Sequence, residues 1–203
     1  MAKKIQKTKS ALKAQRDSLE RFERYLPTLE LKKQQLRMEV RRVGRQLEEQ
    51  RAGIDALLDE VSSWVGLFNE DVDLEGLVEL REAHFSKGNI AGVSVPVFES
   101  AEFDRKDIDL YATPLWFDRG AEIMEEVIRR RLAAAALAES LNRLNEELRI
   151  TSQRVNLFEK VKIPETRENI SIINIALGDA QTAAVVRAKI AKKETVEVDT
   201  MSV

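Results

Sequence analysis

Residues 36–57 read Leu36-Arg-Met-Glu-Val-Arg-Arg-Val-Gly-Arg-Gln-Leu-Glu-Glu-Gln-Arg-Ala-Gly-Ile-Asp-Ala-Leu57, and this stretch decides the fold. Its apolar residues recur in alternating steps of four and three, which is the 3.5-residue period of a left-handed coiled coil. A seam with this period would form a helix of about 85 Å, so the sequence predicts an elongated rod. The seam positions are Leu12, Gln15, Leu19, Phe22, Leu26, Leu29, Lys33, Leu36, Val40, Val43, Leu47, Gln50, Ile54, Leu57, Val61, Trp64 and Phe68.

Three seam positions are polar, namely Gln15, Lys33 and Gln50. Polar residues at such positions can fix the register of a coiled coil at some cost in stability. Alternatively, they mark stretches where the rod is hydrated or is held by something other than its partner helix. The sequence leaves both interpretations open.

The composition favours long helices over a large globular core. Charged residues make up 33% of the 203 residues and aromatic residues 5%, with only 8 glycines and 4 prolines. The absence of cysteine excludes disulfides and thiolate metal sites and is typical of a reducing compartment. There is no apolar signal region after the basic N-terminus and no apolar run of membrane-spanning length. We therefore expect a soluble, cytoplasmic protein.

Charge is unevenly distributed along the chain. The net charge is +8 over residues 1–51, −13 over residues 52–128 and +3 over residues 129–203. Basic arms are compatible with nucleic-acid binding, although the outer faces of coiled coils commonly carry solvated charge. The segregation of sign indicates different partners at the two ends.

The middle of the chain, residues 70–113, loses the 3.5-residue period. Two extended runs, 78–85 and 90–98, flank the turn-forming sequence Ser86-Lys-Gly-Asn89 and predict a β-hairpin. Pro96 restricts its strand to a sheet edge. A lone hairpin is only marginally stable, so we expect it to pack against the rod or against a partner.

Two helices flank this region, over residues 1–69 and 114–192, with a frayed tail at 193–203. Pro27 should kink the first helix, and Thr113-Pro114 should begin the second. Beyond Pro164 the apolar frame restarts in a new register. The sequence therefore predicts an all-α protein, a long antiparallel two-helix coiled coil with a short central β-hairpin. Facing residue numbers should sum to about 190, which would place Pro27 opposite Pro164.

Residues that could support catalysis are missing. His84 is the single histidine, no Gly-Lys dipeptide is present for a phosphate-binding loop, and no cluster has metal-ligand spacing. The adjacent pairs Glu48-Glu49 and Glu125-Glu126 are expected to be solvated on helix surfaces. We expect Trp64 and Trp116 to be packing residues, and we predict no catalytic, cofactor or metal site.

Four segments match one protein family in chain order. They are Leu26-Pro-Thr-Leu-Glu-Leu-Lys-Lys-Gln-Gln-Leu36, Gly88-Asn-Ile-Ala-Gly-Val-Ser-Val-Pro-Val97, Thr113-Pro-Leu-Trp-Phe-Asp118 and Arg154-Val-Asn-Leu-Phe-Glu-Lys-Val-Lys-Ile-Pro164. The last is the most specific, with Arg-Val-Asn-x-x-Glu followed closely by Ile-Pro. The chain resembles the D subunits of V-type (archaeal and bacterial vacuolar-type) ATPases over nearly its whole length. It departs at the acidic tail, 194–203, where many relatives end in lysines.

The resemblance implies the role of a central rotor shaft. Such a shaft couples ion translocation through a membrane ring to ATP synthesis or hydrolysis in a catalytic hexamer, and it neither catalyses nor binds a cofactor. The implied partners are the F subunit, the hexamer of A and B subunits and the funnel-like connector of the membrane ring, without nucleic acid or membrane insertion. The implied location is cytoplasmic and peripheral to the membrane. The coupled ion, H⁺ or Na⁺, and the direction of the ATP reaction stay open.

Two sets of residues are expected to contact these partners. Off-seam cations in the terminal arms, between Lys3 and Arg51 and near the C-terminus, suit acidic loops of the catalytic head. The hairpin should contact the F subunit or tune hydrolysis. The head set is Lys3, Lys4, Lys7, Lys9, Lys13, Arg16, Arg187, Lys189, Lys192 and Lys193, and the hairpin set is His84, Phe85, Gly88, Asn89, Ile90 and Gly92.

Three other classes of protein compete with the shaft interpretation. A generic coiled-coil scaffold or tether would explain the seam and the charge pattern, but not the four ordered segments. The gamma subunit of F-type ATP synthases is also a shaft, but it carries a larger α/β domain between its helices than this chain can hold. A nucleic-acid-binding coiled coil is a weaker alternative, to be excluded by a lack of salt-dependent binding.

Overall fold

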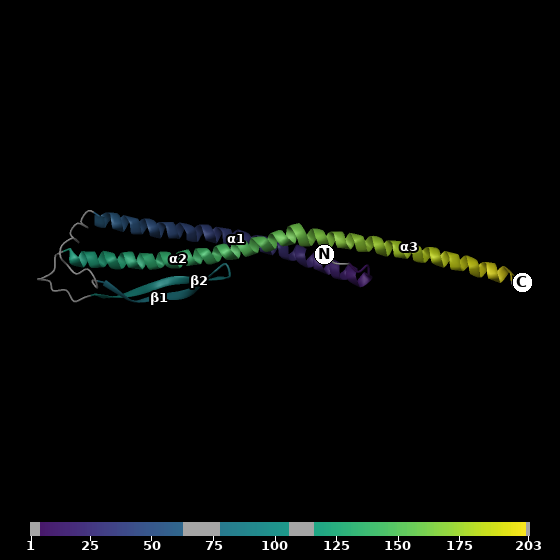
Figure 1. Ribbon diagram of the computed structural model, residues 1–203, viewed down its shortest axis with the longest axis horizontal. Coiled ribbons are helices and arrows are strands. Elements are labelled where there is room, and N and C mark those ends of the chain that lie inside the picture. Colours follow the sequence, from purple (N-terminus) through teal and green to yellow (C-terminus); the bar gives the residue numbers. More distant parts are fainter. Residues whose placement is uncertain (1–4, 63–77, 106–115, 202–203) are drawn as a thin grey trace. The chain divides into compact units, whose positions relative to one another are not determined.

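The computed structural model describes residues 5–62, 78–105 and 116–201. The elements in these ranges are helix α1 (Lys9–Ser62), strands β1 (Val78–Ile90) and β2 (Val93–Arg105), helix α2 (Phe117–Leu157), the π-helical turn η2 (Phe158–Lys162) and helix α3 (Ile163–Met201) (Figure 1). Long N- and C-terminal helices and a central antiparallel hairpin confirm the predicted fold class. None of the described helices combines the length and apolar character that a membrane span requires.

The chain forms two compact units. Unit 1 comprises residues 1–31 and 152–203, and unit 2 comprises residues 32–151. The predicted N-cap Thr113, together with Pro114, Trp64 and Phe68, lies outside the described residues. Trp116 is half-buried, and its carbonyl accepts a hydrogen bond from the N–H of Gly120 as α2 begins.

In unit 2, α1 and α2 run antiparallel with the predicted seam between them. Lys32 Nζ lies 2.6 Å from Glu147 Oε1, and Arg119 Nη2 lies 3.3 Å from Glu60 Oε1, so ascending numbers on α1 face descending numbers on α2. The seam residues bury their apolar side chains because only one stripe of each helix faces its partner. The buried seam residues here are Leu36, Val43, Leu47 and Ile54 on α1 and Ile123, Val127 and Leu144 on α2.

The hairpin turn lies further along the chain than the sequence indicated. Ser86-Lys-Gly-Asn89 belongs to β1, and the turn is formed by Ala91 and Gly92, between the paired residues Ile90 and Val93. Ala91 has φ 52° and Gly92 has φ 82°. Positive φ at both central residues is the geometry of a two-residue hairpin turn that matches the strand twist, and glycine adopts it without steric cost.

The hairpin packs against the helices of unit 2, as expected of a ribbon that is marginal alone. Val95 is 1% exposed and shares a core cluster with Leu36, Val43 and Leu144. In the register set by the Ala91–Gly92 turn, Val95 lies on the face that meets this core. Burial of this face therefore favours the observed turn over the predicted one.

In unit 1, the first part of α1 pairs with the chain from residue 152 onward. The rings of Phe22 and Phe158 lie 5.1 Å apart, and Arg167 Nη2 lies 2.7 Å from Glu23 Oε1. Glu23 precedes Pro27 by one turn, and Arg167 follows Pro164 by about one turn. The two prolines therefore lie at about the same level of an antiparallel pair, as predicted, and α1 continues unbroken through Pro27.

The change of register near Pro164 has a structural cause in η2. The N–H of Ile163 bonds to the carbonyl of Phe158, five residues earlier, so this turn holds one residue more than an α-helical turn. Proline has no N–H, and in an α-helix its ring collides with the carbonyl four residues earlier. The wider π turn leaves space for the ring. The helix then continues to Met201, past Lys192, where the sequence predicted its end.

Candidate interaction surfaces

The base of the hairpin is clamped to α2 by a buried carboxylate. Glu125 on α2 is 6% exposed and accepts hydrogen bonds from Arg105 Nε at 2.5 Å and from Arg129 Nη2 at 2.9 Å. The Arg129 guanidinium also lies 4.9 Å from the ring centre of Phe103 on β2, a favourable cation–π contact. These contacts fix the end of β2 on α2.

The clamp keeps both partners ionised. The hydrogen bond from Arg105 lowers the pKa of Glu125 below its ordinary value, outweighing the opposing effect of burial, and the nearby Arg129 lowers it further. The same hydrogen bond raises the pKa of Arg105. The expectation of a solvated Glu125 was wrong because two cations, one from another element, allow the carboxylate to be buried.

The outer edge of β2 is held by polar side chains of α2. Ser140 Oγ donates to the carbonyl of Pro96 at 3.1 Å, and Arg143 Nη1 donates to the carbonyl of Ser94 at 3.2 Å. Ser140 is 2% exposed. Backbone carbonyls that would face the helix without a partner are thereby satisfied.

The six hairpin residues predicted to bind a partner divide into structural and available ones. Asn89 Oδ1 accepts a hydrogen bond from the N–H of Gly92 and so stabilises the turn, while Ile90 packs on the core cluster. A Cβ at Gly88 would lie 2.8 Å from Val97 Cγ2, so this position needs a glycine. His84 and Phe85 are the two whose side chains stay available for contact.

His84 and Phe85 are partly exposed on β1. His84 lies 3.7 Å from Glu82 and 3.7 Å from Glu102, so a protonated imidazole would face two carboxylates. Phe85 is 49% exposed, and its ring packs edge-on against Phe98 at 5.7 Å. This aromatic pair presents an apolar patch on the hairpin.

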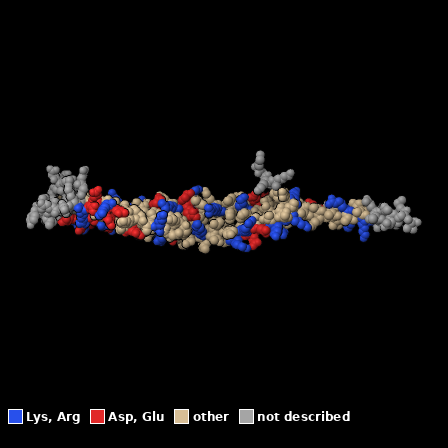
Figure 2. Space-filling view, turned by 90° about the horizontal axis from the view of Figure 1, so that it is seen from below, with Lys and Arg blue, Asp and Glu red and all other residues tan. Residues whose placement is uncertain are grey.

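The structure does not gather the predicted head-binding cations into one patch. The start of α1 lines a shallow groove with residues 162–169, whereas every residue of 178–193 is exposed along α3. Figure 2 shows blue side chains spaced along this part of α3. Lys3 and Lys4 lie outside the described residues. The exposed cations at and just before the start of α1 are Lys7, Lys9, Lys13 and Arg16, and those of α3 are Arg187, Lys189, Lys192 and Lys193.

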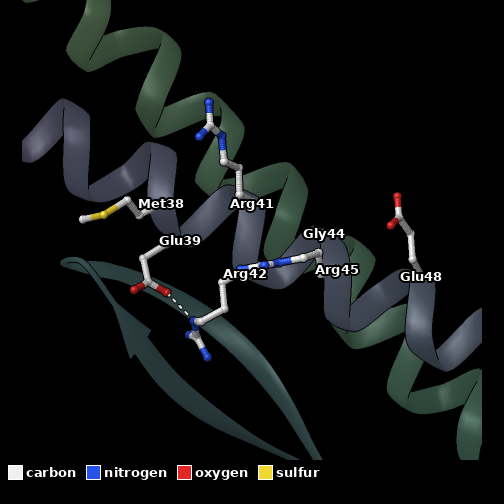
Figure 3. A pocket seen from close by; sticks show the side chains of 7 residues that line it. All are labelled: Met38, Glu39, Arg41, Arg42, Gly44, Arg45 and Glu48. Atoms are coloured by element: carbon white, nitrogen blue, oxygen red, sulfur yellow. Dashed lines mark hydrogen bonds and ion pairs between the residues drawn. The ribbon is translucent and has the colours of Figure 1, made fainter.

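A further basic groove lies on the solvent face of α1 in unit 2 (Figure 3). Arg42 is ion-paired with Glu39 at 2.8 Å and extends toward the hairpin. Arg41 and Arg45, one turn apart, point elsewhere and have no ion pair within the described part of the chain. The groove can therefore receive acidic groups of a partner. Within the described ranges, no group of three carboxylate or histidine side chains could hold a metal ion.

Comparison with known proteins gives a family for this arrangement. A family model for the D subunit of ATP synthase matches residues 11–193. The chain belongs to the family of ATP synthase D subunits. The V-type ATP synthase D subunit of Borreliella burgdorferi is 45% identical over 194 residues, covering 96% of each chain. Those of Chlamydia caviae and Chlamydia muridarum are 32% and 34% identical over 197 residues, covering 96% of this chain and 95% and 97% of theirs.

The family match separates the predicted head-binding residues into two groups. The matched residues 11–193 include Lys13, Arg16 and the cations of α3, whereas Lys7 and Lys9 precede this range. The α3 cations therefore lie on a part of the chain that the family of D subunits shares.

Sequence reasoning missed the residues that attach the hairpin of this D subunit to its helices. Arg105, Arg129, Ser140 and Arg143 lie off the apolar seam, and only tertiary contacts give them a role. One signal was present, since Ser140 is a small polar residue beside the seam leucines Leu137, Leu141 and Leu144 of α2. The position of its partner on β2 depends on the turn, which the sequence placed too early.

Proposed function

We propose that this chain is the central rotor shaft of a V-type ATPase/ATP synthase. It mechanically couples ion translocation through the membrane ring to ATP synthesis or hydrolysis in the catalytic hexamer, and it is itself non-catalytic. The observation that carries the proposal is the antiparallel pairing of the N- and C-terminal helices in both units of a chain that belongs to the family of D subunits. The F subunit, the A and B subunits and the funnel-like connector are its proposed partners.

The helix pairing suits the transmission of torque. A twist applied to one helix is resisted by interlocked apolar side chains along the seam. Cross-helix ion pairs such as Arg167–Glu23 and Lys32–Glu147 add lateral contacts within each unit. Because the hairpin covers one side of the pair, unit 2 presents different faces to its surroundings.

The exposed part of α3 is the proposed contact with the catalytic head. Residues 178–193 carry Arg187 and three lysines together with exposed aliphatic side chains, such as Val185 at 56% and Ile190 at 54%. An exposed helix with both cations and apolar groups suits a binding sleeve with acidic loops and an apolar lining. The hairpin, by the same proposal, contacts the F subunit or tunes hydrolysis.

ATP-driven rotation tests the shaft proposal directly. A complex is assembled from the A, B and F subunits and this chain, the hexamer is fixed to a surface, and a bead is attached to unit 2. We expect the bead to rotate in steps during ATP hydrolysis. A complex that hydrolyses ATP while the chain stays bound and stationary would favour a scaffold or tether instead.

A charge reversal tests the contact with the head. Lys189→Glu should weaken binding of the chain to the hexamer because it places a negative charge against acidic loops. Arg149→Glu is the matched control, because Arg149 is also an exposed helical cation but lies in unit 2. Equal effects of the two substitutions would contradict the α3 contact.

A further inference from the structure

The two outer edges of the hairpin differ in what they can bind. In an antiparallel pair, residues alternate between those that bond across to the other strand and those whose N–H and C=O point outward. The two-residue turn makes Ile90 and Val93 a hydrogen-bonded pair. Counting outward from this pair, the residues with outward backbone groups are Phe85, Lys87 and Asn89 on β1 and Ser94, Pro96 and Phe98 on β2.

Side chains of α2 close the β2 edge. The outward carbonyls of Ser94 and Pro96 are the ones that Arg143 and Ser140 bind, which independently supports the assignment of the alternation. Pro96 has no N–H to offer, and β2 runs on the side of the hairpin that faces α2 (Figure 1). No further strand can pair along this edge.

The β1 edge is open. Across the described ranges, no hydrogen bond reaches the outward backbone groups of Phe85, Lys87 and Asn89. The register irregularities of the hairpin lie between Leu80 and Glu82 and between His84 and Phe85, so pairing is regular from Phe85 to the turn. Natural edge strands are commonly blocked by prolines, bulges, charged side chains or covering elements. Of these, the described part of the chain provides only one charged side chain on this stretch, that of Lys87.

We propose that the outer edge of β1, residues 85–89, binds an extended strand of a partner protein by β-augmentation. This inference rests on the proposed function, because the partner is the F subunit proposed above to contact the hairpin. Outward donors and acceptors recur at every second residue, about 6.6 Å apart, and only an extended chain matches that spacing. A helix already uses its own backbone groups and cannot supply them.

Side chains add specificity to the proposed pairing. Phe85 lies half-exposed on the solvent face of the hairpin, where its ring contacts Phe98. A strand added beside β1 would place one of its side chains next to Phe85. We therefore expect the partner strand to carry an aliphatic or aromatic residue at this position. Ser86 and Gly88 lie on the opposite, half-buried face of β1.

A single proline substitution separates edge pairing from hairpin stability. Lys87 is opposite Pro96 and makes no backbone hydrogen bond within the hairpin. Lys87→Pro therefore removes an outward N–H and obstructs an approaching strand, but it leaves the internal bonds intact. Lys87→Ala is the matched control, because it removes the charge and keeps the N–H. We expect Lys87→Pro to weaken binding of the purified F subunit roughly tenfold and Lys87→Ala to change it much less.

Amide hydrogen exchange resolved to single residues gives the direct measurement. In the free chain, the amides of Ser86, Gly88 and Ile90 should exchange slowly, and those of Lys87 and Asn89 should exchange quickly. The bound F subunit should slow the second set. Retained slow exchange of the first set in the Lys87→Pro variant shows that its hairpin is still formed.

Four results would overturn the inference. If the F subunit binds while Lys87 and Asn89 still exchange quickly, or if the two Lys87 variants bind equally, the edge is not used, although the shaft proposal stands. Concentration-dependent protection together with a dimer in sedimentation would assign the edge to a second copy of the chain. Failure of the F subunit to bind the unmodified chain would remove this inference together with the proposed partner.

Discussion

Removing Arg105 should release the base of the hairpin from α2. In the Arg105→Ala variant, Glu125 keeps Arg129 as its one partner among the described residues, although its side chain is 7% exposed and cannot recover much hydration. An isolated hairpin is only marginally stable, so a hairpin that detaches also unfolds. We therefore expect the variant to lower the free energy of local opening of β1 and β2, with a smaller effect on the helices of unit 1.

The size of this effect follows from burial and charge. A hydrogen bond between charged groups contributes about 1.5–3 kcal/mol. Arg105 and Arg129 are 41% and 42% exposed, so both arginines are partly hydrated in the folded chain. This hydration weakens their bonds to Glu125 relative to fully buried ones. We expect Arg105→Ala to cost about 2 kcal/mol. A double-mutant cycle with Glu125→Gln should give a coupling energy of about 1–2 kcal/mol.

Native-state amide exchange of the hairpin supplies the measurement. The control is the cycle on Arg149 and Glu146, whose atoms lie as close, at 2.6 Å, but are more than half exposed. Solvent screens such a pair, so its coupling should be indistinguishable from zero. A coupling for Arg105–Glu125 no larger than that of the control would refute the reasoning, because burial would then contribute nothing.

The pH dependence of the clamp gives a second check on the same carboxylate. The pKa of Glu125 is lower in the folded chain than the ordinary value of 4.5. Its contribution to stability is therefore present above about pH 4.5 and is lost as the pH falls through the lowered folded value. In Glu125→Gln, hairpin protection should depend less on pH in this range. An unchanged pH profile would show that other carboxylates are responsible.

Two further substitutions and one deletion test the fold. Gly92→Ala should destabilise the hairpin by roughly 1 kcal/mol, because the residue has φ 82°. No described atom lies within 4 Å of the added Cβ, so the cost comes from the backbone conformation and not from a clash. Amide exchange of the hairpin measures this change. Leu36→Ala should lower stability in urea denaturation by about 2–5 kcal/mol, whereas Leu31→Ala, at 66% exposure, should have little effect. Deleting Lys160 should convert η2 to an α-helical turn and preserve most of the helicity seen by circular dichroism, since the buried stripes on both sides would then join in one frame.

The helical part of this fold could be predicted because the spacing of apolar residues along the sequence repeats regularly and involves only near neighbours. A residue such as Leu36 or Val43 is recognised by its spacing from its neighbours, and the structure buries both at about 1% exposure or less. The antiparallel partner was also predictable, since the chain contains a second helical run of apolar residues, among them Ile123, Val127 and Leu144, and sequential elements tend to be neighbours. The fold class thus followed from the apolar pattern alone.

Contacts between the hairpin and α2 could not be predicted in the same way. Glu125 was expected to be solvated because nothing in its local sequence shows that Arg105 lies opposite. The misplaced turn had a related cause, since Gly88-Asn89 and Ala91-Gly92 are both plausible turn sequences. The packing of Val95 on Leu144 favours the second. Such contacts depend on tertiary register, which short sequence patterns do not contain.

The register change near Pro164 connects a local sequence feature, the proline, with the tertiary packing of the two helices. A continuous seam would place Lys162 and Glu165 between the helices after Phe158, which would bury two charges. The extra residue of η2 instead brings Ile163 and Thr166 inward, at 8% and 5% exposure, and the Thr166 hydroxyl donates to the carbonyl of Lys162. The wider turn accommodates Pro164, and the apolar residues that follow benefit from the shift. The π turn is therefore part of the register of unit 1, and it explains why the sequence has two frames on either side of it.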